Sequence, residues 1–171
     1  MTIDAKHIRL LALDVDGVLT DGKLYFSAQG DEMKAFSILD GLGLKMLMQS
    51  DVVVALITGR TSPLVTRRAR DLGIEHIIQG REDKQVALLE LLEELQIDPR
   101  NTAYMGDDLP DLGAISIADI GFTVPNAHDF VKQHADYCTK ASGGEGAVRE
   151  VCELILESKG LLNTLLQTYL P

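Results

Sequence analysis

Short, uninterrupted apolar runs alternate along this chain with longer segments whose apolar residues recur at helical spacing. Apolar runs without polar gaps are typical of strands that are buried on both faces of a parallel sheet. We expect six such strands, at residues 8–13, 52–57, 75–79, 102–105, 121–124 and 137–139. We expect helices at residues 41–50, 63–72, 81–96, 110–118, 127–134 and 147–158. This alternation predicts an α/β fold: a doubly wound, Rossmann-like parallel sheet flanked by helices.

One segment departs from this alternation, directly after the first strand. Two short β-prone stretches, 23–26 and 33–36, flank a polar turn that contains glycine, which predicts a small β-hairpin insertion at about residues 22–37. The tail at residues 160–171 is rich in leucine and is compatible with packing on its own core or on a neighbouring subunit. No repeat or linker marks a second domain, so we expect residues 1–171 to form a single domain.

Composition and charge limit the classes of function. The chain has 171 residues, of which 46% are hydrophobic and 25% charged, as in ordinary soluble globular proteins. Its net charge of -10 argues against nucleic acid or an anionic membrane as the partner. Cys138 and Cys152 lack metal-site spacing and are expected to be buried, reduced thiols. The first seven residues lack the apolar core of a signal peptide, and no apolar run reaches membrane-spanning length, so we expect a cytoplasmic protein.

The candidate chemistry begins where the first apolar run ends, in Asp14 and Asp16 followed at once by Gly17. Burying two carboxylates that repel each other is costly unless a cation shares their site. A glycine at this point allows a tight turn and the close approach of a ligand. Because ligands bind at the carboxyl edge of a parallel sheet, we expect a metal ion and an anion there. The pattern predicts a Mg²⁺-dependent phosphatase.

Further polar residues are expected at the same edge of the sheet. Thr58 follows the second predicted strand, Lys84 lies in the helix after the third, and Asp107 and Asp108 follow the fourth, with Asp111 one turn later. Taken singly, each residue has a structural explanation, such as a turn, a cap, a solvated lysine or an acid at a helix start. Carboxylates after two strands, together with a hydroxyl and an ammonium group, form a much more specific pattern.

These residues resemble the four motifs of the haloacid dehalogenase superfamily of phosphotransferases. Several strings also resemble one branch of it, the 3-deoxy-D-manno-octulosonate 8-phosphate (KDO 8-phosphate) phosphatases. The strings lie at residues 14–22 (DVDGVLTDG), 40–43 (DGLG), 58–60 (TGR), 106–108 (GDD) and 143–150 (GGEGAVRE). The resemblance runs from residue 8 to about residue 156. Glu145 stands where many relatives carry a basic residue, and it departs from the pattern.

The resemblance implies Mg²⁺ as the cofactor, held by Asp14, Asp107 and the backbone carbonyl of Asp16. It implies that Asp14 attacks phosphorus to give an aspartyl-phosphate, which water then hydrolyses. Asp16 would protonate the departing sugar oxygen and later accept a proton from the attacking water.

The remaining motif residues have supporting roles in this interpretation. Thr58 would hydrogen-bond the transferring phosphoryl group, and Lys84 would neutralise that group and the nucleophile. Asp108 and Asp111 would orient the metal ligands, the metal-bound waters or Lys84.

The substrate is expected to contact the residues around these motifs. Arg60 can reach a substrate carboxylate through a bidentate contact, the alternative being a surface ion pair. Gly59 and Gly17 are further candidates for substrate binding. The glycine-rich loop at residues 143–146 could cradle a dinucleotide, but it precedes the last predicted helix, and we expect a flexible rim of the active site instead.

The predicted function is hydrolysis of KDO 8-phosphate, a sugar-acid phosphate, in lipopolysaccharide biosynthesis. The chain has no room for the cap domain of many relatives, and the resemblance implies a homotetramer in which a neighbour's hairpin covers each site. Tyr25, Phe26 and Phe36 would be the apolar anchors of this hairpin. The alternatives are a nonulosonate 9-phosphate phosphatase and a non-catalytic oligomerisation module. A response-regulator receiver domain fits less well, because its phospho-accepting aspartate follows the third strand, which here ends in Gln79-Gly80.

Overall fold

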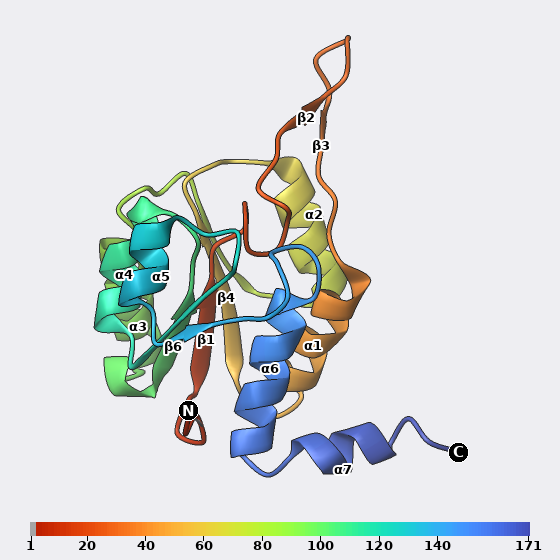
Figure 1. Ribbon diagram of the computed structural model, residues 1–171, viewed down its shortest axis with the longest axis vertical. Coiled ribbons are helices and arrows are strands. Elements are labelled where there is room, and N and C mark those ends of the chain that lie inside the picture. Colours follow the sequence, from red (N-terminus) through yellow and green to blue (C-terminus); the bar gives the residue numbers. More distant parts are fainter. Residues whose placement is uncertain (1–2) are drawn as a thin grey trace.

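The computed structural model describes residues 3–171. Residues 1 and 2, which belong to the segment expected to lack the apolar core of a signal peptide, lie outside the described residues. A six-stranded, fully parallel sheet runs through its centre in the order β5-β4-β1-β6-β7-β8 (Figure 1). The strands are β1 (Leu10–Leu13), β4 (Val53–Thr58), β5 (His76–Gln79), β6 (Thr102–Met105), β7 (Ile120–Thr123) and β8 (Tyr137–Cys138). The predicted doubly wound sheet is confirmed. The chain reverses its direction of travel across the sheet between β1 and β6, which is where sheets of this type bind ligands.

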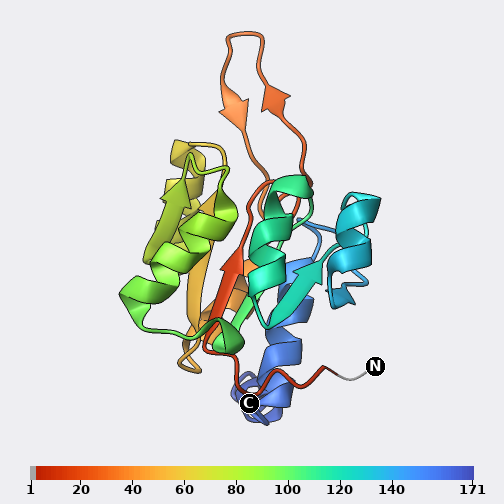
Figure 2. The ribbon, with the colours of Figure 1, turned by 90° about the vertical axis from the view of Figure 1, so that its left-hand side faces the viewer.

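Helices cover both faces of this sheet (Figures 1 and 2). On one face lie α1 (Ile38–Met48), α2 (Pro63–Leu72) and α6 (Ala147–Ser158). On the other lie α3 (Lys84–Leu95), α4 (Leu112–Ile117) and α5 (Asp129–His134). Successive side chains of β1 point to opposite faces, so that Leu11 and Leu13 enter the first layer while Leu10 and Ala12 enter the second. All four side chains are fully buried, which anchors the end of β1 from both sides.

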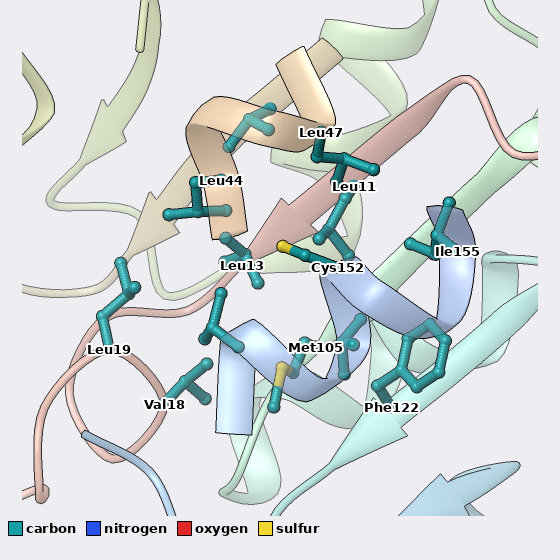
Figure 3. Packing of buried hydrophobic residues seen from close by; sticks show 14 of the residues in the cluster. Leu11, Leu13, Val18, Leu19, Leu44, Leu47, Met105, Phe122, Cys152 and Ile155 are labelled. Carbon is teal, nitrogen blue, oxygen red and sulfur yellow. The ribbon is translucent and has the colours of Figure 1, made fainter. Parts of the chain in front are cut away.

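Figure 3 shows the core layer beneath α1 and α6. Leu44 and Leu47 from α1 and Ile155 from α6 pack around the β1 leucines. Cys152 lies among them as a free, fully buried thiol, and burial raises its pKa. Cys138 is also a free cysteine. Cys138 is exposed, so the expectation of buried thiols is confirmed for Cys152 and wrong for Cys138.

Several predicted boundaries differ from those observed, and each difference has a local cause. Helix α1 begins at Ile38 because the Ser37 hydroxyl accepts a hydrogen bond from the backbone N–H of Asp40. The segment predicted as one helix at residues 110–118 is a 3₁₀ turn, η2 (Leu109–Asp111), followed by α4. Asp108 and Asp111 form a capping box around that turn. A second 3₁₀ turn, η1 (Pro99–Asn101), precedes β6.

The insertion after β1 is an antiparallel hairpin formed by β2 (Tyr25–Phe26) and β3 (Glu32–Met33). It stands away from the body of the protein, above the carboxyl ends of the sheet strands (Figures 1 and 2). Tyr25, Phe26 and Met33 are exposed. Phe36 lies beyond the hairpin strands, packs on the core of its own chain and has the Arg68 guanidinium 5.8 Å from the centre of its ring. Phe36 is half-buried against its own chain, and its role as an anchor on a neighbouring subunit stays a prediction.

The leucine-rich tail contains one short helix, α7 (Leu162–Gln167), at the end of the molecule opposite the hairpin (Figure 1). Leu162 and Leu165 pack against the chain's own core, whereas Leu166, Tyr169 and Leu170 are exposed. Of the two arrangements left open by the sequence, packing on the same chain accounts for the inner face of the tail. Among the helices of residues 3–171, none has the length and apolar character needed to cross a membrane.

Candidate active site

The predicted site residues gather in one cleft of about 330 Å³ at the carboxyl edge of the sheet. Asp14 directly follows β1 and Asp107 closely follows β6, so the two flank the point at which the chain reverses across the sheet. Carboxylate oxygens of Asp14, Asp107 and Asp111 all lie within 4.8 Å of one another. The cleft lining also includes Asp16, Thr58, Gly59, Lys84 and Asp108.

Lys84 is held between two of these carboxylates. Its Nζ lies 2.9 Å from Asp14 Oδ2 and 2.7 Å from Asp111 Oδ1, and all three side chains are buried. Burial alone lowers the pKa of Lys84, but the charges of Asp14 and Asp111 and their hydrogen bonds outweigh this effect and raise it. Lys84 is therefore a charged ammonium group beside Asp14.

Asp111 is saturated by contacts within the protein. Its Oδ1 accepts hydrogen bonds from Lys84 and, at 2.8 Å, from the Tyr104 hydroxyl. Its Oδ2 accepts the backbone N–H groups of Asp107 and Asp108, each at 3.1 Å. Four donors on two oxygens leave little capacity for a metal ion. Asp111 thus fixes Lys84 and the loop that carries Asp107.

Asp14 and Asp107 carry negative charge that Lys84 does not fully balance. Burial raises the pKa of Asp14 to about 7, with the Asp111 charge adding to the rise and Lys84 opposing it. Burial, followed by the charges of Asp14 and Asp111, raises the pKa of Asp107 to about 7 as well. Asp107 Oδ1 is buried and has no hydrogen-bond partner within residues 3–171. A hard divalent cation that takes oxygen ligands would balance the excess negative charge and contact the unpartnered Asp107 Oδ1. These residues therefore fit Mg²⁺.

Gly17 shapes the wall of the cleft beside Asp107. Its φ of +94° lies in the left-handed region, and a Cβ atom at this position would overlap with the Asp107 carboxylate. Only glycine meets both conditions without displacing Asp107. Gly17 therefore allows the backbone to pack closely on Asp107, and the approach of a ligand at Gly17 stays a prediction.

The glycine-rich loop supports the acidic loop from behind, so the expectation of a flexible rim is wrong. Gly144 N–H donates to Val18 O at 2.9 Å, and a Cβ atom on Gly143 would overlap with Gly17 O. Asn126 joins the two loops, because its Nδ2 donates to Gly17 O at 3.1 Å while its Oδ1 accepts Gly143 N–H at 2.8 Å. Asn126 belongs to none of the predicted motifs, and a lone asparagine in the sequence gives no signal of such a role.

Thr58 and Arg60 form the opposite side of the cleft. Thr58 is buried, and its Oγ1 accepts the Arg60 N–H at 3.3 Å, which leaves the hydroxyl hydrogen free to donate. The Arg60 side chain is 45% exposed, at the rim, with Nη2 3.1 Å from Glu32 Oε1 and Nε 3.8 Å from Asp16 Oδ2. Lys34, just after β3, forms an ion pair with Asp16. Sequence reasoning missed Glu32 and Lys34, because single charges on a short hairpin belong to no motif.

Comparisons with known proteins identify the family of this chain. The family model of haloacid dehalogenase-like hydrolases matches residues 73–151. The chain is 48% identical to the 3-deoxy-D-manno-octulosonate 8-phosphate phosphatase KdsC of Escherichia coli over 159 residues, which is 93% of this chain and 85% of that protein. It is 49% identical to the enzyme of the same name from Yersinia pestis, over 89% of this chain and 81% of that protein.

Two solved structures extend the likeness to the whole fold. The Moraxella catarrhalis 3-deoxy-D-manno-octulosonate 8-phosphate phosphatase, in complex with magnesium, phosphate and KDO, superposes with a TM-score of 0.95 at 50% identity, over 97% of this chain and 95% of that chain. The cobalt-bound Haemophilus influenzae enzyme superposes with a TM-score of 0.93 at 38% identity, over 99% and 100% of the two chains. This chain belongs to the 3-deoxy-D-manno-octulosonate 8-phosphate phosphatase family of haloacid dehalogenase-like hydrolases.

Proposed function

We propose that this protein is a Mg²⁺-dependent phosphomonoesterase that hydrolyses KDO 8-phosphate to KDO and phosphate, a step of lipopolysaccharide biosynthesis. The observation that carries this proposal is the convergence of Asp14, Asp107 and the charged Lys84 at the carboxyl edge of the sheet. The family relationship at 48% identity supports the choice of substrate. A non-catalytic oligomerisation module would not need buried carboxylates whose pKa values are raised to about 7.

Asp14 is the proposed nucleophile. One of its oxygens attacks phosphorus, and the bond from phosphorus to the sugar oxygen breaks, which gives an aspartyl-phosphate. Asp16, which lines the same cleft, donates a proton to the departing sugar oxygen and accepts one from the water that attacks the intermediate. The Lys84 ammonium and the Thr58 hydroxyl face the charge that develops on the transferred group.

Asp14, Asp107 and the backbone carbonyl of Asp16 would hold the Mg²⁺ ion. When bound, the ion offsets negative charge on these carboxylates and on the phosphoryl oxygens. Asp111 orients Lys84 and the Asp107 loop through its four contacts, and Asp108 caps the following turn through the Leu109 N–H at 2.9 Å. These are positioning roles.

Arg60 is the proposed contact for the carboxylate of the sugar acid, with Gly59 and Gly17 lining its approach. Arg60 stands at the rim, where a planar guanidinium can bind a carboxylate through two hydrogen bonds. A nonulosonate 9-phosphate also has this carboxylate group and is the second candidate substrate. The two substrates differ mainly beyond the carboxylate.

A phosphate-release assay over sugar phosphates, with and without Mg²⁺, tests this assignment. We expect turnover of KDO 8-phosphate that requires Mg²⁺, and weak turnover of mannose 6-phosphate. Arg60→Met should raise the KM for KDO 8-phosphate by about 10-fold to 100-fold, because a charged hydrogen bond is lost. It should leave the KM for mannose 6-phosphate unchanged.

Arg67→Met is the matched control, because Arg67 is another exposed arginine on the neighbouring helix α2. We expect this variant to retain the wild-type KM for both substrates. A wild-type preference for mannose 6-phosphate would contradict the choice of a sugar acid. Equal effects of the Arg60 and Arg67 substitutions would remove the role of Arg60.

The proposed assembly is a cytoplasmic homotetramer in which hairpin tips reach neighbouring subunits. Large apolar side chains are exposed on the hairpin and at the start of α1, including Phe26 at 61% and Ile38 at 82% exposure. An exposed apolar surface that spans two adjacent elements is typical of an interaction site. The short hairpin cannot enclose the cleft of its own chain, so a neighbour's hairpin would supply the cover.

Light scattering on the purified protein tests the assembly. We expect a tetramer, dissociation of the tetramer by Phe26→Asp, and a higher KM for KDO 8-phosphate in that variant. Val86→Asp is the control, since Val86 is an exposed apolar residue on α3, away from the hairpin. An active wild-type monomer that still selects KDO 8-phosphate would contradict the proposal.

A further inference from the structure

Four charged side chains of alternating sign form a closed ring at the mouth of the cleft. Lys34 contacts Asp16, and Asp16 Oδ2 lies 3.8 Å from Arg60 Nε. Arg60 Nη2 lies 3.1 Å from Glu32 Oε1, and the same oxygen lies 3.4 Å from Lys34 Nζ. The ring joins the hairpin, which carries Glu32 and Lys34, to the loops after β1 and β4.

Glu32 is the member of this ring with no role in the proposed chemistry. A single oxygen of its carboxylate lies within ion-pair distance of both cations, Arg60 and Lys34. The Lys34 side chain is 1% exposed, so one of the two cations is almost entirely withdrawn from solvent. The position between a guanidinium and an ammonium group suits a carboxylate, whichever molecule supplies it.

We propose that Glu32 holds the place of the substrate carboxylate while the cleft is empty, and that the sugar acid displaces it from Arg60 and Lys34. This inference rests on the proposed function, because it assumes an anionic sugar. Exchange of one carboxylate for another preserves both ion pairs, whereas a neutral sugar offers no replacement. Arg60 and Lys34 thus favour an acidic substrate, and Glu32 competes with that substrate for them.

The hairpin that carries Glu32 can change its conformation at a small cost in free energy. Its two strands have two residues each and, within residues 3–171, form a separate two-stranded sheet. Isolated two-stranded hairpins are marginally stable in water, so displacement of one side chain or a shift of the whole hairpin costs little. The Glu32–Arg60 pair is partly exposed, since the two side chains are 22% and 45% accessible, and such pairs are weak.

Glu32→Gln removes the competing charge and keeps the size of the side chain. We expect the KM for KDO 8-phosphate to fall about threefold, the range of a partly exposed ion pair, with kcat unchanged. The dissociation constant for free KDO, measured by calorimetry, should fall by a similar factor. The KM for mannose 6-phosphate should not change, because a neutral sugar does not compete for Arg60.

Asp31→Asn is the matched control, because it removes the same charge from the adjacent hairpin position. The Asp31 carboxylate contacts Ser27 at 3.0 Å and is not part of the ring. We expect it to leave all three values unchanged. A higher KM for KDO 8-phosphate in Glu32→Gln, or values equal to those of Asp31→Asn, would overturn the inference. A wild type that does not prefer KDO 8-phosphate over mannose 6-phosphate would refute the proposed function itself, a result read before any variant is made.

Discussion

Asp14→Asn is expected to lower kcat for phosphate release by at least about 10⁴-fold, because an amide cannot form the aspartyl-phosphate. The variant keeps the shape of the side chain, and Lys84 keeps its ion pair with Asp111 at 2.7 Å. The loss should therefore appear in kcat with every phosphate ester. Rapid mixing with KDO 8-phosphate should trap a phosphorylated protein in the wild type and none in the variant.

Thermal unfolding separates this chemical loss from loss of the fold. Burial raises the pKa of Asp14 to about 7, so the folded state holds its proton more tightly than the unfolded state does. The resulting penalty on stability grows as pH rises from about 4 to about 7 and is complete at pH 8. Asp14→Asn removes this penalty, so its melting temperature at pH 8 without metal should equal or exceed that of the wild type.

Asp129→Asn is the matched control for this experiment, because Asp129 is an exposed aspartate on α5 whose carboxylate pairs with Lys132 at 2.7 Å. We expect it to retain wild-type turnover. Substantial turnover by Asp14→Asn, or its loss together with the fold, would contradict the role given to Asp14.

Asp107→Asn is expected to raise the Mg²⁺ concentration needed for half-maximal activity by more than about 100-fold, since even residues behind metal ligands change affinity by 10-fold to 100-fold. The buried Oδ1 of Asp107 has no hydrogen-bond partner within residues 3–171 and is the oxygen most in need of a cation. Steady-state rates across a Mg²⁺ titration, begun from protein treated with a chelator, provide the measurement.

Asp108→Asn provides the comparison at the adjacent position. Asp108 is exposed, and its Oδ1 caps the Leu109 N–H at 2.9 Å. We expect a smaller change in the Mg²⁺ requirement of this variant than in Asp107→Asn, because Asp108 acts only through the cap. If the two substitutions shift the requirement equally, the effect comes from the negative charge of the loop as a whole and not from a ligand at Asp107.

Much of the fold follows from local patterns that few alternatives can satisfy. The apolar run that becomes β1 is long enough only for a strand, and its burial on both faces requires helices on both sides. Because parallel strands end at one edge of the sheet, the sequence alone predicts that Asp14 and Asp107 lie close together. The helix predicted at residues 63–72 has these bounds in α2, because the Ser62 cap, Pro63 and the left-handed Gly73 act locally.

The contacts that the sequence did not reveal depend on the directions of single side chains. Tyr104 reads as a core residue of β6, and only the fold directs its hydroxyl to Asp111. Lys34 and Glu32 reach the cleft because the hairpin begins and ends beside its mouth, an arrangement set by the fold and not by any motif. Asn126 acts through two backbone groups that are far from it in the sequence.

The central claim is that Asp14 and Asp107 bind the same Mg²⁺ ion. Calorimetric titration of Mg²⁺ tests it most directly, with the metal-free wild type, Asp14→Asn and Asp107→Asn as samples. We predict a single Mg²⁺ site in the wild type, weakened by more than about 100-fold in each variant. Unchanged Mg²⁺ affinity in either variant would contradict a cation shared by Asp14 and Asp107.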